Sequence, residues 1–577
     1  MKKLSLFILI ISIVLIGLTG CSGSKESTTT APATVSTESV SEPTVEATAE
    51  TEKETVATEE TVPTEPVTSG KPETASGTIT VYDTNEIRTL VQWAASDTQS
   101  FTVLNNVFEG LYRLGIDHQP EPALATGYTV SDDKLTYTFT LRDGIQWSNG
   151  TPITAKDFVF AWLKQMGPDA TNGYSFIMND YIVNGTEYNE GKVKAEEVGV
   201  KAIDDKTLEV NLKTPTPYFI RLTTLSMYFP LNEEFVTSQG DQYGVKAENM
   251  IYSGPYVITS YDPVVGTTLE KNEKYWDAAN VAVKNVNIKI IKDQSAALNA
   301  YKAGELSKVL LSSTDVAVYK NDPEFHSQSE FRTTYLQFNT TAKGLDNVNI
   351  RKALGYSIDR SILADTILAD GSAAAEGLVS FGVAGDGTST FRELNGNLSP
   401  FDPEKAKEYW AKGVEELGEA PQLTLLIADD SVTKTVATFV QSQFKDNLGI
   451  DVAIDSKTSK ARNELMDNNN YQFAITAWGA DYDDAMTYLD LWTNGTPYRG
   501  NYSNETYNKL IADAKKETDE AKRLTMMLDA EKILLDTDAV ISPLYYRGFA
   551  YLQKSNIENL VTHPFGNPLE FKYAKIK

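Results

Sequence analysis

The chain has 577 residues, more than one hydrophobic core usually supports, so its length predicts two or three domains. Its 79 acidic and 52 basic residues give a formal net charge of −27, which argues against nucleic acid as a partner because phosphate binding needs a basic surface. A single cysteine excludes internal disulfides and zinc sites built on cysteine pairs, and the three histidines lie far apart in the sequence, so neither a metal site nor a cofactor is expected.

The first element along the chain is an N-terminal processing signal. Lys2 and Lys3 precede an almost wholly apolar run over residues 4–18, which is shorter than the roughly 20 residues that a membrane-spanning helix needs. The run ends in the sequence LTGC, which closes on Cys21 and resembles the bacterial lipobox. The resemblance implies a lipoprotein signal peptide over residues 1–20, cleavage before Cys21, and acyl chains on Cys21 that anchor the protein to the membrane. An ordinary cleaved signal with an incidental cysteine is the alternative.

Residues 21–76 form the next segment, which is dominated by Thr, Glu and Pro and has no aromatic residue or apolar periodicity. Such a composition cannot bury enough apolar surface to offset the entropy of ordering the chain. Repulsion between glutamates and the stiffness of proline favour an extended conformation. We therefore expect a disordered tether between the lipidated Cys21 and the folded part.

Globular sequence begins near residue 77. Alternating apolar and polar residues predict strands over residues 77–84, 134–142, 207–213, 334–340 and 422–428. Helix-start signals predict helices that begin at the N-caps Thr154, Asp293 and Asp402, and a further helix from residue 431 that stops at Gly449 before another strand. Helices and strands that alternate in this way predict an α/β architecture.

The richest local constellation lies between residues 473 and 495. The apolar run 473–478 is typical of a buried strand, and it leads to Asp481 at its carboxyl end. In α/β folds, ligands bind outside the carboxyl ends of strands, and an acid flanked by Trp478 and Tyr482 can hold a cation there. The next two aspartates are expected to cap a helix over residues 485–492. An exposed acidic loop or a simple cap is the alternative for Asp481 itself.

Enzymatic templates are missing from the sequence. It contains no HExxH metal motif, no GxSxG nucleophile elbow and no phosphate-binding P-loop. No nucleophile–base pair is visible either, which disfavours a surface hydrolase. We expect a binding protein and not an enzyme.

Several longer stretches resemble the dipeptide/oligopeptide solute-binding proteins of ABC transporters. They include VFEGLYRLGIDHQPEPALATGYTVSDDKLTYTFTLRDGIQWSNG, IYSGPYVITSYDPVVGTTLEKNEKYWDAANV, LQFNTTAKGLDNVNIRKALGYSIDR and WGADYDDAMTYLDL. The resemblance covers the chain from about residue 78 to its end, and the motifs occur in the order that the family has.

The resemblance implies a periplasmic-binding-protein-like fold, with two lobes around a hinge and an additional inserted domain. By this resemblance the first lobe comprises residues 77–106, 222–311 and 549–577. The inserted domain comprises residues 107–221, and the second lobe residues 312–548. Closure of the lobes around the hinge would trap the ligand.

The resemblance also implies which residues bind the ligand. In peptide-binding members, the aspartate that matches Asp481 pairs with the terminal ammonium of the ligand. Such a contact serves every peptide, whatever its side chains are. The remaining residues that the resemblance places around the cleft are Trp478, Ala480, Tyr482, Asn339, Ser96 and Tyr174.

The sequence departs from the family at two positively charged positions. Well-studied enterobacterial members carry arginines at the positions of Ile475 and, approximately, Met466. We therefore expect the ligand to be held mainly through its backbone and N-terminus.

The implied partners are an oligopeptide and the permease subunits of an ABC importer. We expect a lipid-anchored monomer at the extracytoplasmic face of the bacterial cell membrane, with no nucleic acid bound. A signalling peptide, a sugar or a metal chelate as the ligand of the same fold remains an alternative.

Overall fold

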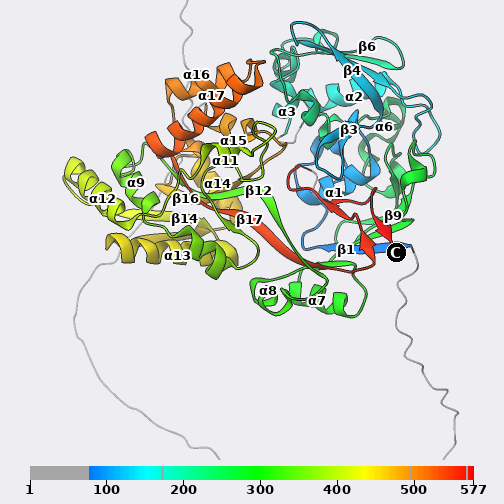
Figure 1. Cartoon of the computed structure of the whole chain (residues 1–577). Coiled ribbons are helices and arrows are strands. Elements are labelled where there is room, and N and C mark those ends of the chain that lie inside the picture. Colours follow the sequence, from blue (N-terminus) through cyan, green and yellow to red (C-terminus); the bar gives the residue numbers. More distant parts are fainter. Residues whose placement is uncertain (1–76, 171–173, 494, 567–568) are drawn as a thin grey trace, which may run out of the picture. The chain divides into compact units, whose positions relative to one another are not determined.

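The computed structural model describes residues 77–170, 174–493, 495–566 and 569–577 (Figure 1). The predicted signal peptide, Cys21 and the tether lie outside these residues. The described part falls within one unit of contacts, residues 70–577. No helix among the described residues has both the length and the apolar character needed to cross a membrane.

The first sheet combines strands that are far apart in the sequence. Its order is β1 (Thr78–Asp83), β10 (Asn285–Ile290), β9 (Gly266–Lys271) and β8 (Tyr256–Asp262), with β1 parallel to β10 and the other pairs antiparallel. The strand predicted over residues 77–84 is thereby confirmed. Helix α1 (Thr98–Val107) follows β1 and is capped by Asp97, whose carboxylate accepts a hydrogen bond from the Ser100 amide at 2.9 Å.

A second sheet is antiparallel and has the order β4 (Ala125–Val130), β5 (Thr136–Leu141), β7 (Thr207–Asn211) and β6 (Val200–Ala202). Strands β5 and β7 confirm two of the strand predictions. Helix α2 (Ala155–Met166) packs against β6 and β7. It begins after Thr154, whose capping box with Asp157 is present as the sequence predicts.

The largest sheet has the order β11 (Lys308–Leu310), β17 (Ile541–Gln553), β12 (Phe325–Phe338), β16 (Phe473–Gly479), β14 (Leu423–Ala428) and β15 (Val452–Lys457). A short strand, β13 (Ala373–Ala374), also pairs with β17. The long strands β12 and β17 run side by side, antiparallel, as Figure 1 shows. Strands β14, β15 and β16 are parallel to one another, and β16 is antiparallel to β12.

Three helices pack on this sheet and on one another. Helix α13 (Ser431–Leu448) contacts β14 and β15, α9 (Val348–Tyr356) contacts β17, and α12 (Pro403–Leu417) packs against both helices. Asp402 caps α12 and Gly449 ends α13 at a φ of 71°, where a residue without a Cβ is favoured. Helix α7 (Gln294–Lys302) starts after its cap Asp293. These helix starts and stops are confirmed.

Two local predictions are corrected by the structure. The strand predicted over residues 334–340 begins at Phe325 and ends at Phe338, because β12 pairs with β17 along most of its length. The helix predicted over residues 485–492 is a single turn, α15 (Met486–Leu489), followed by a 3-10 turn.

The two aspartates before α15 also differ from each other. Asp484 does accept a hydrogen bond from the Met486 amide at 2.9 Å, as a cap would. Asp483 instead accepts a bond from the amide of Ala384, at 2.8 Å, so its predicted role as a helix cap is wrong. A tertiary contact, invisible in the local sequence, takes its carboxylate.

Candidate functional site

Backbone contacts on two sides fix the position of Asp481. Strand β16 pairs with β12, so that Gly479 lies opposite Arg332. The ladder continues one residue further, because the amide of Ala480 donates to the carbonyl of Phe331 at 2.7 Å. The Asp481 amide then donates to Thr487 Oγ1 at 3.2 Å. A strand therefore delivers Asp481 to a defined place just beyond its carboxyl end, as the sequence predicts.

The Asp481 side chain is half-buried, and its carboxylate has no polar partner among the described residues. Among the described residues, no hydrogen bond or ion pair within 4 Å engages it. Burial raises the pKa of Asp481 to about 7, while the Arg332 guanidinium acts in the opposite direction. A carboxylate partly shielded from water and without a counter-charge is unfavourable, so this position favours a cation that enters from outside.

Four of the other predicted residues gather around Asp481. Ala480 precedes it and lines a cavity. Tyr174 lies close enough for the Asp481 charge to add to the effect of burial and raise the tyrosine pKa. Tyr482 is buried and stacks on Tyr218, with ring centroids 5.1 Å apart. Trp478, half-buried on β16, packs under the guanidinium of Arg499 at 5.2 Å.

The structure does not bring Asn339 to this place. Asn339 follows the end of β12, where Phe338 lies opposite Phe473 at the start of β16. Seven residue steps of about 3.3 Å separate Asn339 from Arg332, which lies at the Asp481 end of the strand pair. Its side chain is buried and donates to Asn469 Oδ1 at 2.8 Å and to the Tyr471 carbonyl at 2.9 Å, so it holds loops together.

Ser96 occupies a different position again. It is exposed in the segment just before Asp97, the cap of α1. The first turn of α1 does line the cavity, through Thr98, Gln99 and Thr102, whereas Ser96 itself does not. The predicted region is thus near the cavity, although the predicted residue is not part of its wall.

A cavity of about 390 Å³ is lined by Gly479 and Ala480, the two residues before Asp481, whereas Asp481 itself is not one of its lining residues. Its walls come from the end of β1, the first turns of α1, the strands β11, β12 and β17, the end of β16 and residues 562–566. This volume falls within the roughly 300–1,000 Å³ typical of small-ligand sites. The walls come from the first sheet, through β1, and from the largest sheet, through β11, β12, β16 and β17. A ligand in the cavity would therefore contact both sheets at once.

The cavity wall also carries charged residues that the sequence analysis did not identify. Arg332 and Arg547 line it, with Glu330 near both, at 3.8 and 3.5 Å. Lys308 lines it as well and is almost fully buried. A charged side chain inside an otherwise apolar strand, as in KVLL and PLYYRGFAYL, is the signal that could have found Lys308 and Arg547.

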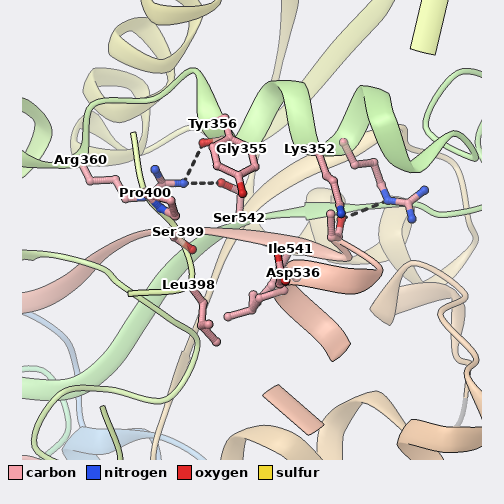
Figure 2. A pocket seen from close by; sticks show the side chains of 13 residues that line it. Lys352, Gly355, Tyr356, Arg360, Leu398, Ser399, Pro400, Asp536, Ile541 and Ser542 are labelled. Carbon is pink, nitrogen blue, oxygen red and sulfur yellow. Dashed lines mark hydrogen bonds between the residues drawn. The ribbon is translucent and has the colours of Figure 1, made fainter. Parts of the chain in front are cut away.

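Figure 2 shows another pocket, which lies beside α9 and holds only about 30 Å³, room for about two waters. Arg360 lines it and donates to the Gly355 carbonyl at 3.0 Å and to Ser542 Oγ at 2.8 Å. Burial lowers the pKa of Arg360 to about 10. Since its guanidinium is engaged by the protein itself, we assign this pocket a structural role.

Two of the three histidines meet although they are 445 residues apart in the sequence. The Nδ1 atoms of His118 and His563 lie 2.9 Å apart, so sequence distance was a poor guide to their placement. No group of three or more potential metal-ligating side chains of His, Cys, Asp or Glu occurs in the described part of the chain.

Comparison with known proteins identifies the family of this chain. The model of the middle part of the bacterial extracellular solute-binding proteins, family 5, matches residues 119–500. The chain belongs to this family. The predicted family resemblance is therefore confirmed, and the family is one of extracellular solute-binding proteins, which agrees with the prediction of a binding protein outside the cytoplasm.

Relatives of this family 5 protein agree in sequence and in fold. The oligopeptide-binding protein OppA of Bacillus subtilis is 33% identical over 504 residues, which cover 84% of this chain and 90% of that protein. Peptide-bound OppA of Listeria monocytogenes matches with a TM-score of 0.74 and 34% identity, over 87% of this chain and 99% of that one. The pheromone receptor PrgZ, solved to describe its mode of peptide binding, matches with a TM-score of 0.75 and 33% identity over the same shares. The predicted α/β fold of the periplasmic-binding-protein type is confirmed.

Proposed function

We propose that this family 5 protein captures oligopeptides in the cavity beside Asp481 and delivers them to an ABC importer. The observation that carries the proposal is the half-buried Asp481 carboxylate, which has no partner among the described residues. Every peptide with a free N-terminus brings an ammonium with three hydrogen-bond donors, which would supply the missing partner. A peptide backbone in extended conformation would add contacts that do not depend on sequence.

The ligand can be identified without a prior guess. The purified full chain is exposed to a mixed peptide library, washed, and its bound compounds are released and identified by mass spectrometry. We expect peptides with free N-termini, and calorimetry should show that N-acetylation of the same peptides weakens binding at least tenfold. Recovery of sugars or metal chelates in place of peptides would contradict the proposal.

A signalling peptide is the second candidate ligand, and one observation favours it. The relative PrgZ is a pheromone receptor, and it is as similar to this chain as the oligopeptide-binding relatives are. The library experiment separates the two roles, because a nutrient importer would retain peptides of many sequences, whereas a signal receptor would retain one.

We also propose the domain boundaries and a closure motion. The inserted domain, residues 107–221, and the second lobe, residues 312–548, touch next to Asp481. Tyr218 stacks on Tyr482 with an interplanar angle of 5°, and Arg221 lies 3.7 Å from the Asp484 carboxylate and also donates to the carbonyl of Asp483. Contacts of this kind would stabilise a closed form around a bound peptide.

Replacing Tyr218 by alanine is expected to weaken peptide binding three- to tenfold, mainly through faster dissociation, because the stack with Tyr482 is lost. Aromatic pairs contribute about 0.5–1.5 kcal/mol beyond the area that they bury. Stopped-flow dissociation of a labelled peptide measures the effect. Exposed Tyr128→Ala is the control, and equal dissociation rates for wild type and Tyr218→Ala would remove the proposed closure contact.

Membrane attachment is proposed through lipid on Cys21, with residues 22–76 as a tether that gives the binding domains reach. The protein would act as a monomer at the extracytoplasmic face of the membrane. The support is the LTGC sequence after a short apolar run.

Replacing Cys21 by serine is expected to abolish lipid labelling and to shift the protein from the membrane fraction to the medium, or to leave its signal peptide uncleaved. Metabolic labelling with a fatty acid and fractionation measure both effects. Ser22→Ala is the neighbouring control. If Cys21→Ser protein were correctly cleaved and stayed in the membrane fraction, the anchor would have to lie elsewhere.

A further inference from the structure

Strand β11 carries a buried ammonium that has no counter-charge among the described residues. Lys308 on β11 is 8% exposed and lines the cavity, as does Leu310 two residues on, because alternate strand residues share a face. No carboxylate of the described residues lies within 4 Å of its Nζ. A buried lysine is almost always paired, so an unpaired one at a cavity wall calls for an explanation.

The contacts that Lys308 does make leave its hydrogen-bonding capacity incomplete. Its Nζ donates to Thr562 Oγ1 at 2.6 Å and lies 3.8 Å from the ring centroid of Tyr551. An ammonium has three donors, and only one of them reaches an oxygen of the described residues. Burial alone lowers the pKa of Lys308 to about 7, which is the mark of a cation that the protein does not compensate.

A second unsatisfied group lines the same cavity, one residue after Thr562. This residue, His563, is 2% exposed. Its Nδ1 faces His118, while its Nε2 is buried and has no hydrogen-bond partner among the described residues. Buried polar atoms are nearly always satisfied, so this atom independently points to a polar group that is supplied from outside.

The other two cations that line the cavity differ from Lys308 because a carboxylate lies near them. Arg332 and Arg547 are both near Glu330, so their charge is at least partly balanced within the protein. Lys308 thus gives the β11 side of the cavity an unpaired positive charge. Asp481, which directly follows the lining residues Gly479 and Ala480, carries an unpaired negative charge near the β16 side. This polarity matches a ligand that carries an ammonium at one place and a carboxylate at another.

We propose that Lys308, with Thr562 and His563 beside it, forms a carboxylate-binding subsite that receives the C-terminal carboxylate or an acidic side chain of the bound peptide. The proposal rests on the proposed peptide-binding function and adds a determinant of which peptides are preferred. At the positions where enterobacterial members carry arginines, this chain has Ile475 and Met466, which are uncharged and buried. Lys308 would supply a positive charge from a different element.

The test uses peptides that the library experiment recovers, each remade in matched pairs. One pair differs in the C-terminus, free acid against amide, and the other pair has glutamine in place of each glutamate. Lys308→Met removes the charge at similar volume, and Lys320→Met, an exposed lysine on the same unit, is the control. Affinities are measured by calorimetry on the full chain.

We expect Lys308→Met to weaken binding of the carboxylate form by about ten- to hundredfold and to leave its neutral partner unchanged. A loss confined to the acid–amide pair assigns the subsite to the C-terminus, and a loss confined to the glutamate–glutamine pair assigns it to a side chain. Equal effects on charged and neutral partners, or no effect, would overturn the proposal while peptide binding itself stands. If the library yields no peptide, the proposed function fails first and this inference with it.

A measurement on the wild type covers the case in which Lys308→Met does not fold. Calorimetry at pH 7 in two buffers of different ionisation enthalpy gives the protons taken up on binding. Proton release or uptake by Asp481 is the same for both peptides of a pair, so it cancels when the proton uptake of one peptide is subtracted from that of the other. With a pKa of about 7, Lys308 should take up about half a proton more with the carboxylate form than with its neutral partner. Equal proton uptake together with equal wild-type affinity for the two members of each pair would overturn the proposal.

Discussion

Asp481→Asn is expected to weaken the binding of peptides with a free N-terminus by at least tenfold, since a charge-assisted hydrogen bond contributes about 1.5–3 kcal/mol. The substitution preserves the size of the side chain and removes only its charge. N-acetylated forms of the same peptides, which bring no ammonium, should bind wild type and Asp481→Asn protein equally weakly. Calorimetry on the purified full chain at pH 8 measures all four affinities.

The control for this prediction is Asp446→Asn, which removes an exposed carboxylate on α13 and should change neither affinity. The four affinities form a cycle of two changes, acetylation of the ligand and substitution of Asp481. The energy of the ammonium–carboxylate contact is the amount by which the two separate losses of binding free energy exceed the loss when both changes are made. If acetylation and Asp481→Asn weakened binding additively, the ammonium would bind elsewhere.

The raised pKa of Asp481 adds a pH dependence with a defined sign. In the unfolded chain this carboxyl ionises near pH 3.8, whereas in the empty folded protein it ionises near pH 7. Between these values the unfolded state loses its proton first, so the stability of the empty protein falls as pH rises through this window. The effect reaches as much as about 4 kcal/mol above pH 7, at 1.36 kcal/mol per unit of pKa.

Asp481→Asn should therefore raise the unfolding temperature of the empty protein at pH 8 and have little effect at pH 4. Peptide affinity should change in the opposite sense, because the ammonium requires the ionised carboxylate. We expect wild-type affinity for amidated peptides with a free N-terminus to fall as pH drops from 7 to 5, and the Asp481→Asn protein to lack this fall. A gain in function at the cost of stability is common at binding sites.

Local sequence patterns predicted those features that depend on neighbouring residues. The capping box at Thr154 and the glycine stop at Gly449 are decided within one helical turn, and both are present. The strand that leads to Asp481 was equally legible, because a short apolar run followed by polar residues suffices to predict it. The acid of the proposed site could thus be named from sequence and family resemblance together.

Asn339, which the family resemblance placed at the cleft, lies away from it because of the direction of its strand. Polar residues after a strand are good candidates for a ligand site only if the strands are parallel, because then their carboxyl ends meet at one edge. Strand β12 is antiparallel to β16, so the residue after β12 lies at the edge where β16 begins. Strand direction depends on the topology of the whole sheet, which the local sequence does not contain.

Lys308 and the pair of His118 with His563 were missed for a related reason. Each owes its environment to a partner more than 200 residues away in the sequence: Thr562 for Lys308, and His118 for His563. The chemistry of a residue follows from what tertiary packing places beside it. A lysine inside an apolar strand was the only local sign, and it was ambiguous, because exposed edge strands also carry lysines.

Arg113→Ala is expected to lower the free energy of unfolding by about 3–5 kcal/mol, the cost of leaving buried charges without a partner. Arg113 is 5% exposed, and its Nη atoms lie 2.6 Å from Glu109 and 2.8 Å from Glu570, which are exposed by 1% and 2%. Burial alone would lower the pKa of Arg113, but the two carboxylates more than offset this and hold it well above its ordinary value. Removing the arginine would strand two buried negative charges.

The effect should extend to the binding site, because this network holds the C-terminal segment in place. The side chain of Asn106 on α1 donates to the Leu569 carbonyl at 2.8 Å and accepts from the Phe571 amide at 2.9 Å, next to Glu570. Residues 562–566, just before this anchor, line the cavity. Loss of Arg113 should therefore weaken peptide binding as well, although Arg113 is not a lining residue.

Urea unfolding followed by tryptophan fluorescence measures the loss of stability, and exposed Arg88→Ala is the control, with an expected change within about 0.5 kcal/mol. A triple variant, Arg113→Met with Glu109→Gln and Glu570→Gln, should recover part of the loss because it leaves no unpaired charge. If Arg113→Ala cost less than 1 kcal/mol, or if the triple variant were less stable than the single one, uncompensated charge would not be the reason for the loss.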